Sequence, residues 1–156
     1  MQFNDTQLDA VQQFLQAGNL LAYPTEAVWG IGCDPFNETA VKQILAIKRR
    51  PIEKGMIVIT GDIAHIQPFL QPLPKQVVDS IAASWQSSDA QATTWLLPIP
   101  ASLQGKIPDW VTGGRDSLAI RVITHPMIAK LCNTIAHADN NNPFGFLVKA
   151  ASMFDM

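Results

Sequence analysis

The sequence has few cysteines and no long apolar run. Only Cys33 and Cys132 are present among 156 residues, and no C-x-x-C pair occurs, so neither a disulfide framework nor a zinc site of that kind is expected. No apolar run reaches the roughly 18 residues that a transmembrane helix needs. The N-terminus lacks the basic start and apolar core of a secretion signal. These absences predict a cytoplasmic protein with no membrane partner.

Two common phosphate-binding motifs are also missing. The pattern G-x-x-x-x-G-K-[ST] does not occur, which excludes a P-loop. Gly30 and Gly32 form only a G-x-G pair, which is too short for a dinucleotide fingerprint. We expect these two glycines to allow a turn or a close approach of two backbones. No carboxylate pair identifies a metal site, and none is predicted.

Charged residues are scarce, and the basic ones are concentrated in one segment. They make up 15% of the chain, and the formal net charge of −2 argues against general polyanion binding. Five of the eleven basic residues are Lys42, Lys48, Arg49, Arg50 and Lys54. One interpretation is structural, because cations at a helix C-terminus suit the helix dipole. The other is functional: Arg forks and Lys charges together can clamp a phosphate.

Strands alternate with helices along the chain. This order predicts one α/β domain over residues 1–156, with a twisted mixed sheet and helices packed on it. Asp5 or Thr6 is the expected cap of the first helix, and Asn37 the cap of the second. The expected strands are residues 19–23, 56–60, 93–97, 117–122 and 146–148; the expected helices cover about 6–17, 38–47, 74–85 and a segment beginning at 125.

The character of the chain changes after about residue 137. Residues 137–143 contain the run Asn140-Asn141-Asn142, which we expect to contribute nothing to a core. The part of the domain from about residue 137 is therefore predicted to be degenerate or missing.

Three motifs resemble one family. Residues 23–32, Y-P-T-E-A-V-W-G-I-G, resemble the Y-P-T-E-[TA]-[VY]-[YFW]-G-[LIV]-G signature of the YrdC-domain family. Residues 48–51, K-R-R-P, resemble its K-x-R-P loop. Residues 117–122, S-L-A-I-R-V, followed by His125-Pro126, resemble its S-[LV]-A-[VI]-R-[VI]-x-x-H-P segment. Order and spacing agree over roughly residues 19–131, and the three matches together are far more specific than any one.

The resemblance implies a fold, a reaction and a set of site residues. The fold is a YrdC-like α/β domain. The reaction joins L-threonine, bicarbonate and ATP into threonylcarbamoyl-AMP and releases pyrophosphate, for the t6A modification of tRNA. By match to their motifs, Lys48 and Arg50 would hold the triphosphate and act in catalysis, and Thr25 and Arg121 would hold the threonine. Thr94 is the threonine that remains of the family's W-P-G-P-x-T segment. Magnesium is expected to accompany ATP, and tRNA or other t6A-pathway proteins are compatible partners.

The end of the chain departs from the family pattern. After the last helix the family carries S-T-S-A-N-x-S-G, whose Ser and Asn contact the nucleotide phosphates, whereas Met153 takes the Asn position here on an ungapped match. The resemblance therefore leaves two interpretations open. The chain is a C-terminally truncated synthase, or it is a catalytically impaired YrdC-like module that binds nucleotide or RNA.

Overall fold

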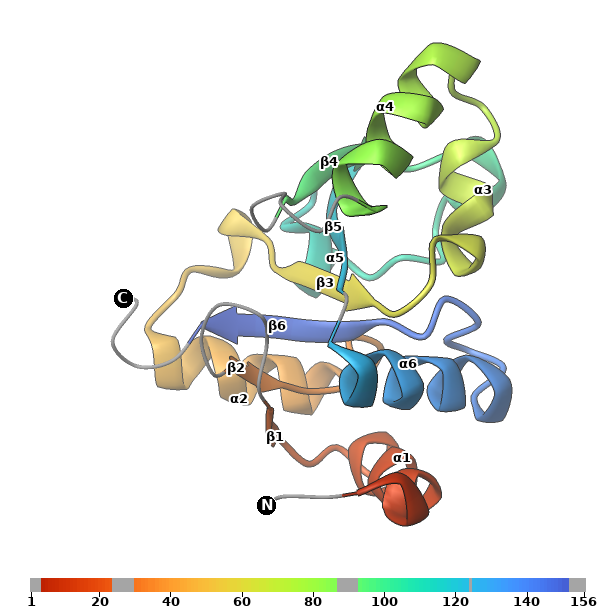
Figure 1. The fold of residues 1–156 in the computed structure, drawn as a ribbon. Helices are drawn as coiled ribbons and strands as arrows, with labels where there is room; N and C mark the ends of the chain where they lie inside the picture. The colour runs from red at the N-terminus through yellow and green to blue at the C-terminus, as the bar shows by residue number, and fades with distance from the viewer. Residues whose placement is uncertain (1–3, 24–29, 87–92, 124, 152–156) are drawn as a thin grey trace.

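The computed structural model describes residues 4–23, 30–86, 93–123 and 125–151, and these form a sheet with helices on both faces (Figure 1). The sheet has six strands in the order β1-β2-β6-β3-β5-β4. β3 and β5 run parallel, and the other neighbouring strands pair antiparallel. The predicted mixed α/β fold is confirmed. The strands are β1 Leu21–Tyr23, β2 Gly30–Gly32, β3 Ile57–Thr60, β4 Trp95–Pro98, β5 Ser117–Val122 and β6 Leu147–Ala151.

Two hydrophobic cores lie on opposite faces of this sheet. The central strands contribute side chains to both cores. Val58 of β3 is buried in the larger core and its neighbour Ile59 in the smaller one. Strands that are apolar on both faces are typical of the interior of a covered sheet. Figure 1 shows α6 below β6 as drawn, with α1 below α6. The large core takes side chains from α2 Glu38–Lys48, α3 Gln67–Leu70, α4 Lys75–Gln86 and α5 Asp109–Thr112; the small core takes them from α1 Leu8–Gln16 and α6 Pro126–Ala138.

The helix caps are partly as predicted. Asn37 caps α2, because its Oδ1 accepts a hydrogen bond from the Ala40 backbone N at 3.0 Å. The prediction that Asp5 or Thr6 caps the first helix is wrong, because a 3-10 turn precedes α1 and Asn4 caps that turn. Asn4 Oδ1 accepts from Thr6 N at 2.9 Å, and the side chain of Gln7 accepts in return from Asn4 N. Such a reciprocal capping box satisfies backbone donors that the first turn leaves open.

The two glycines of the G-x-G pair form β2, which was not predicted as a strand. A Cβ atom on Gly32 would lie 2.4 Å from Cε1 of Tyr23 and 2.5 Å from the carbonyl oxygen of Val148. The Tyr23 hydroxyl donates to that same carbonyl at 3.0 Å. The expected close approach is therefore confirmed: only a residue without a side chain lets β1 and β6 both pack closely against β2.

The C-terminal stretch, residues 139–151, belongs to the core, so the expectation that residues 137–143 contribute nothing to it is wrong. Asn142 is fully buried, and its side-chain amide donates to the Phe146 carbonyl at 2.9 Å while its Oδ1 accepts from Phe146 N at 3.0 Å. The Thr60 hydroxyl donates to the Phe144 carbonyl at 2.7 Å. β6 then inserts between β2 and β3. The Asn run reads as polar loop in the sequence, but an Asn amide can replace backbone partners in a buried turn.

None of the helices in the described ranges is both long and apolar enough to cross a membrane.

Candidate functional site

The basic loop, residues 48–55, follows α2 and turns sharply at Arg49. Arg49 has φ 50° and ψ 39°, the left-handed conformation that commonly ends a helix. The chain then reverses, with Arg50 N bonded to the Leu45 carbonyl at 2.9 Å. Nε of Arg50 donates to the Gly55 carbonyl at 2.9 Å, which closes the loop. Lys48 is half-buried, whereas Arg49 and Arg50 are exposed.

α5 holds the main chain of the basic loop. Met56 N donates to the Val111 carbonyl at 2.7 Å, just where the loop enters β3. A Cβ on Gly113 would lie 2.6 Å from the Glu53 carbonyl oxygen, so α5 and the loop are in tight backbone contact. Because the backbone is held in place, the positive side chains are presented from a fixed position. This arrangement suits the binding of an anion better than a freely mobile loop would.

Arg121 is a buried charge on β5. It is 3% exposed, and it pairs with Ile59 of β3, so it lies on the face of the sheet that carries the small core. Burial holds the pKa of the Tyr23 phenol well above its usual range; Cys132 and Cys33 add to the rise, and the positive charge of Arg121 opposes it. Arg121 and Tyr23 are thus within electrostatic reach of each other. A buried guanidinium is a strong candidate for binding an anionic group.

Of the two predicted threonines, Thr94 lies within the described residues and Thr25 does not. Trp95 pairs with Ile120 in the antiparallel β4–β5 ladder, so the register places Thr94 next to Arg121, where it is exposed. Thr25 lies outside the described residues. The expectation that Thr25 and Arg121 together hold the threonine therefore stays a prediction.

The basic loop leads into strand β3, and Arg121 lies beside the same strand. Gly55 ends the loop two residues before Ile57, and Ile59 is the residue beside Arg121. Four residues of strand separate these two levels, about 13 Å at ~3.3 Å per residue. This is a separation of main-chain positions, which the long side chains of Lys48, Arg50 and Arg121 can shorten.

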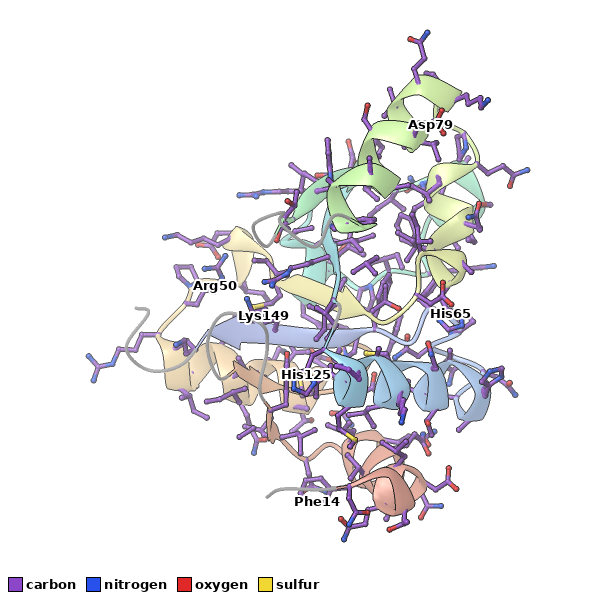
Figure 2. All side chains as sticks on the ribbon, viewed as in Figure 1. Phe14, Arg50, His65, Asp79, His125 and Lys149 are labelled. Carbon is purple, nitrogen blue, oxygen red and sulfur yellow. The ribbon has the colours of Figure 1, made fainter. Side chains whose placement is uncertain are left out.

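Lys149 was not among the predicted site residues, although it lies on the same face as Arg121. It is half-buried on β6 and pairs with Ile57 of β3 (Figure 2). One signal could have identified it: on the ungapped match that gives Met153 the Asn position, Lys149 takes the position of the family's first Ser.

The two cysteines are not candidates for nucleophilic chemistry. Both are fully buried. Burial raises the pKa of the Cys33 thiol to about 12, with the charge of Asp34 adding to the rise. Burial alone raises the pKa of Cys132 to about 12. Thiolate is the reactive form, so the buried Cys33 and Cys132 fit the interior as small apolar side chains.

A cleft of about 390 Å³ opens where the parallel strands β3 and β5 end. Among the described residues that line it, Asp62 is the one charged side chain, so this cleft does not suit an anion. Within the described ranges, no three His, Cys, Asp or Glu side chains gather closely enough to hold a metal ion. The cleft is lined by Gly61, Asp62, Ile63, Ala82, Trp85, Val122, Ile123 and Ala129.

Comparison with known proteins identifies the family. The family model Sua5_yciO_yrdC, described as "Telomere recombination", matches residues 13–149. The threonylcarbamoyl-AMP synthase of Psychrobacter cryohalolentis is 49% identical over 143 residues, covering 88% of this chain and 66% of the relative. That of Acinetobacter baylyi is 46% identical over 140 residues, covering 88% and 67%. This chain belongs to the Sua5/YciO/YrdC family, as its three motifs indicate. It spans about two thirds of the length of these relatives.

Solved structures show the same fold. Sua5 of P. abyssi complexed with L-threonine has a TM-score of 0.71 and 22% identity, covering 96% of this chain and 39% of that one. E. coli YciO has a TM-score of 0.71 and 13% identity, covering 96% and 65%. At these identities the likeness concerns the fold. Most of the described chain therefore shares the fold of these structures.

Proposed function

We propose that this protein makes threonylcarbamoyl-AMP from L-threonine, bicarbonate and ATP. The observation that carries the proposal is the rigidly held basic loop at one end of a sheet that also bears the buried Arg121. Curated relatives at 46–50% identity are named threonylcarbamoyl-AMP synthase. The threonylcarbamoyl group would serve the t6A modification of tRNA, which suits a cytoplasmic protein.

The chemistry assigns a role to each charged group. The amino group of threonine bonds to the carbon of bicarbonate with loss of water to form a carbamate, and one carbamate oxygen attacks the α-phosphorus of ATP. The new oxygen–phosphorus bond replaces the bond to the β-phosphate, and pyrophosphate leaves. Such displacements depend mainly on positioning and on neutralising charge. Lys48 and Arg50 would hold the triphosphate and stabilise the leaving pyrophosphate.

The threonine would bind further along the sheet. Arg121 would pair with its carboxylate, with Thr94 next to Arg121 and Thr25 completing the pocket. The separation of about 13 Å between the loop and Arg121 suits an extended product, in which an amino acid is joined to a nucleotide. The described residues do not offer a ligand set for magnesium, so the ion would accompany ATP through its phosphate oxygens.

A pyrophosphate-release assay tests this function. With ATP, threonine and bicarbonate together we expect release, and omission of threonine or of bicarbonate should abolish it. Lys42→Ala is a matched control, because Lys42 is an exposed lysine on α2 paired with Glu38. Release that persists without threonine would indicate that the protein hydrolyses ATP to AMP and pyrophosphate, and this would contradict the proposal.

The second candidate is a YrdC-like module that binds nucleotide or RNA without catalysis. It is favoured by the sequence Lys-Ala-Ala-Ser-Met at residues 149–153, where the family has Ser-Thr-Ser-Ala-Asn. The basic loop could contact phosphates of RNA as well as of ATP. This module would bind ATP but release no pyrophosphate. Insertion of the family segment after Val148 would then raise turnover, whereas an unmodified chain that turns over equally fast would show that the segment is dispensable.

A further inference from the structure

A small cavity lies beside the small core, where three segments that are far apart in the sequence meet. Its volume is about 10 Å³, which is room for one water-sized body. Gln12 of α1, Asp34 after β2 and Asp139 at the end of α6 all line it, with α1 below α6 in Figure 1. None of residues 48–55, all of which the structure describes, lines this cavity, so it is separate from the candidate nucleotide site.

Two carboxylates, those of Asp34 and Asp139, face this cavity from buried positions, 9% and 5% exposed. Asp34 Oδ1 accepts a hydrogen bond from Phe36 N at 2.9 Å. Asp139 Oδ1 accepts one from Asn141 N at 3.0 Å. Within the described ranges, neither carboxylate forms an ion pair with a basic side chain. Because two like charges face one small volume, each is unfavourable unless a cation or a shared proton lies between them.

Gln12 adds a neutral oxygen from a third segment. It is 5% exposed, and its amide nitrogen donates to Gln16 Oε1 at 2.8 Å. That bond leaves the carbonyl oxygen of Gln12 for the cavity, and no donor bonds to this oxygen in the part of the chain that the structure describes. The amide of Asn142, which also lines the cavity, is bonded to Phe146 at both ends. A buried oxygen without a donor is unfavourable, and a cation satisfies it together with the two carboxylates.

We propose that Asp34, Asp139 and Gln12 form a binding site for one calcium-sized divalent cation. A divalent ion neutralises both carboxylates, and amide oxygens are common ligands of calcium. Calcium accepts about six to eight oxygens in flexible arrangements, so bidentate carboxylates and main-chain carbonyls would complete the set. Magnesium keeps several of its waters, for which a cavity of about 10 Å³ has no room.

The ion would act on the fold and not on the nucleotide. It would join α1, the turn after β2 and the end of α6 through their oxygen ligands. A ligand that binds only the folded state stabilises that state as its concentration rises. The inference therefore does not depend on the proposed reaction.

Calcium binding and thermal unfolding of the full chain at neutral pH test the site, after EDTA treatment and removal of the chelator. CaCl₂ should raise the unfolding temperature of the parent chain, and MgCl₂ should raise it much less. In calorimetric titration, Asp34→Asn and Asp139→Asn should each weaken calcium binding by about tenfold or more, because affinity follows the charge of the ligands. Gln12→Met should weaken it less. Asp79→Asn removes an exposed carboxylate of α4 and should bind calcium as the parent chain does.

The outcomes are distinct. A parent chain without a calcium-dependent rise in unfolding temperature overturns the proposal, because the two carboxylates then share a proton and not a metal ion. Equal calcium binding by Asp34→Asn and the parent chain places the ion elsewhere and is equally contrary. Equal stabilisation by magnesium overturns the calcium-sized assignment. Threonine-dependent pyrophosphate release without calcium binding defeats this inference alone, whereas calcium binding without such release defeats the proposed function alone.

Discussion

The basic loop and the C-terminal stretch both carry polar residues, but the stretch buries some of its polar side chains whereas the loop exposes its arginines. In the loop the main chain is held by α5 and the side chains of Arg49 and Arg50 are exposed. In the stretch Asn142 is fully buried and Asp139 is 5% exposed. Polar groups on a fixed surface loop are available to a ligand, whereas buried ones are consumed in satisfying the backbone. Changes of the exposed basic side chains in the loop should therefore alter binding, and changes of the buried Asn142 in the stretch should alter stability.

The largest effect is expected at Asn142. Asn142→Ala removes two buried hydrogen bonds and leaves the N–H and the carbonyl of Phe146 without these partners. We expect the free energy of unfolding to fall by about 3 kcal/mol. Denaturant titration measures it. Asn141→Ala is the matched control, because that side chain is exposed. Equal losses in the two variants would mean that burial does not distinguish the neighbouring asparagines.

Alanine substitutions in the basic loop should act on binding instead. Lys48→Ala and Arg50→Ala should each weaken ATP binding by about 1.5–3 kcal/mol, since each removes a charge-assisted contact. Arg49→Ala should have a smaller effect, because Arg49 is not part of the K-x-R match. Calorimetric titration of the three variants ranks them. A ranking led by Arg49→Ala would reverse the assignment, and a large loss of stability in Lys48→Ala would contradict the contrast between the two regions.

The next effect concerns Asp34, which lies near Asp139 of the C-terminal stretch. Burial raises the pKa of Asp34 to about 6 from its ordinary value of 3.8; the bond from Phe36 N opposes the rise, and the charge of Asp139 adds to it. Because the folded-state pKa of an acid is raised, stability should fall as the pH rises from about 4 to about 6. Asp34→Asn removes that loss, so it should stabilise the protein by on the order of 2 kcal/mol above pH 7 and by much less near pH 4.

Unfolding free energies measured from pH 4 to pH 8 test the Asp34 prediction. The difference between Asp34→Asn and the parent chain should grow with pH. Asp79→Asn, on the exposed side of α4, serves as control and should show no such growth. A constant difference across the range would show that the Asp34 carboxylate ionises as easily in the folded protein as in the unfolded chain.

The smallest effect is expected at Arg49. Its φ of 50° is unfavourable for a residue with a Cβ atom, so Arg49→Gly should stabilise the protein by up to about 1 kcal/mol. ATP affinity should stay close to that of the parent chain. Thermal unfolding and ATP titration together check both statements. A loss of ATP affinity comparable to that of Lys48→Ala would make Arg49 a ligand.

Several features could be predicted from the sequence because local signals specify them. Asn37 caps α2, Pro51 follows the helix end, and the apolar runs around Val58 and Ile120 form central strands. The three motifs also indicated the family and the basic loop. Each of these signals lies within a few residues of the feature that it predicts.

Other features depend on partners far away in the sequence, and only the tertiary structure decided them. β2 is a strand because β1 and β6 lie on either side of it, and Gly32 is required there by Tyr23 and Val148. Asn142 is buried because the turn before β6 packs into the interior, and β6 is a central strand because β2 and β3 lie on either side of it. Burial and strand pairing are set by segments up to 125 residues apart, as in the bond from Tyr23 to Val148. No local pattern of residue types carries that information, because the same polar residue is stable either in water or in a buried turn that satisfies its hydrogen bonds.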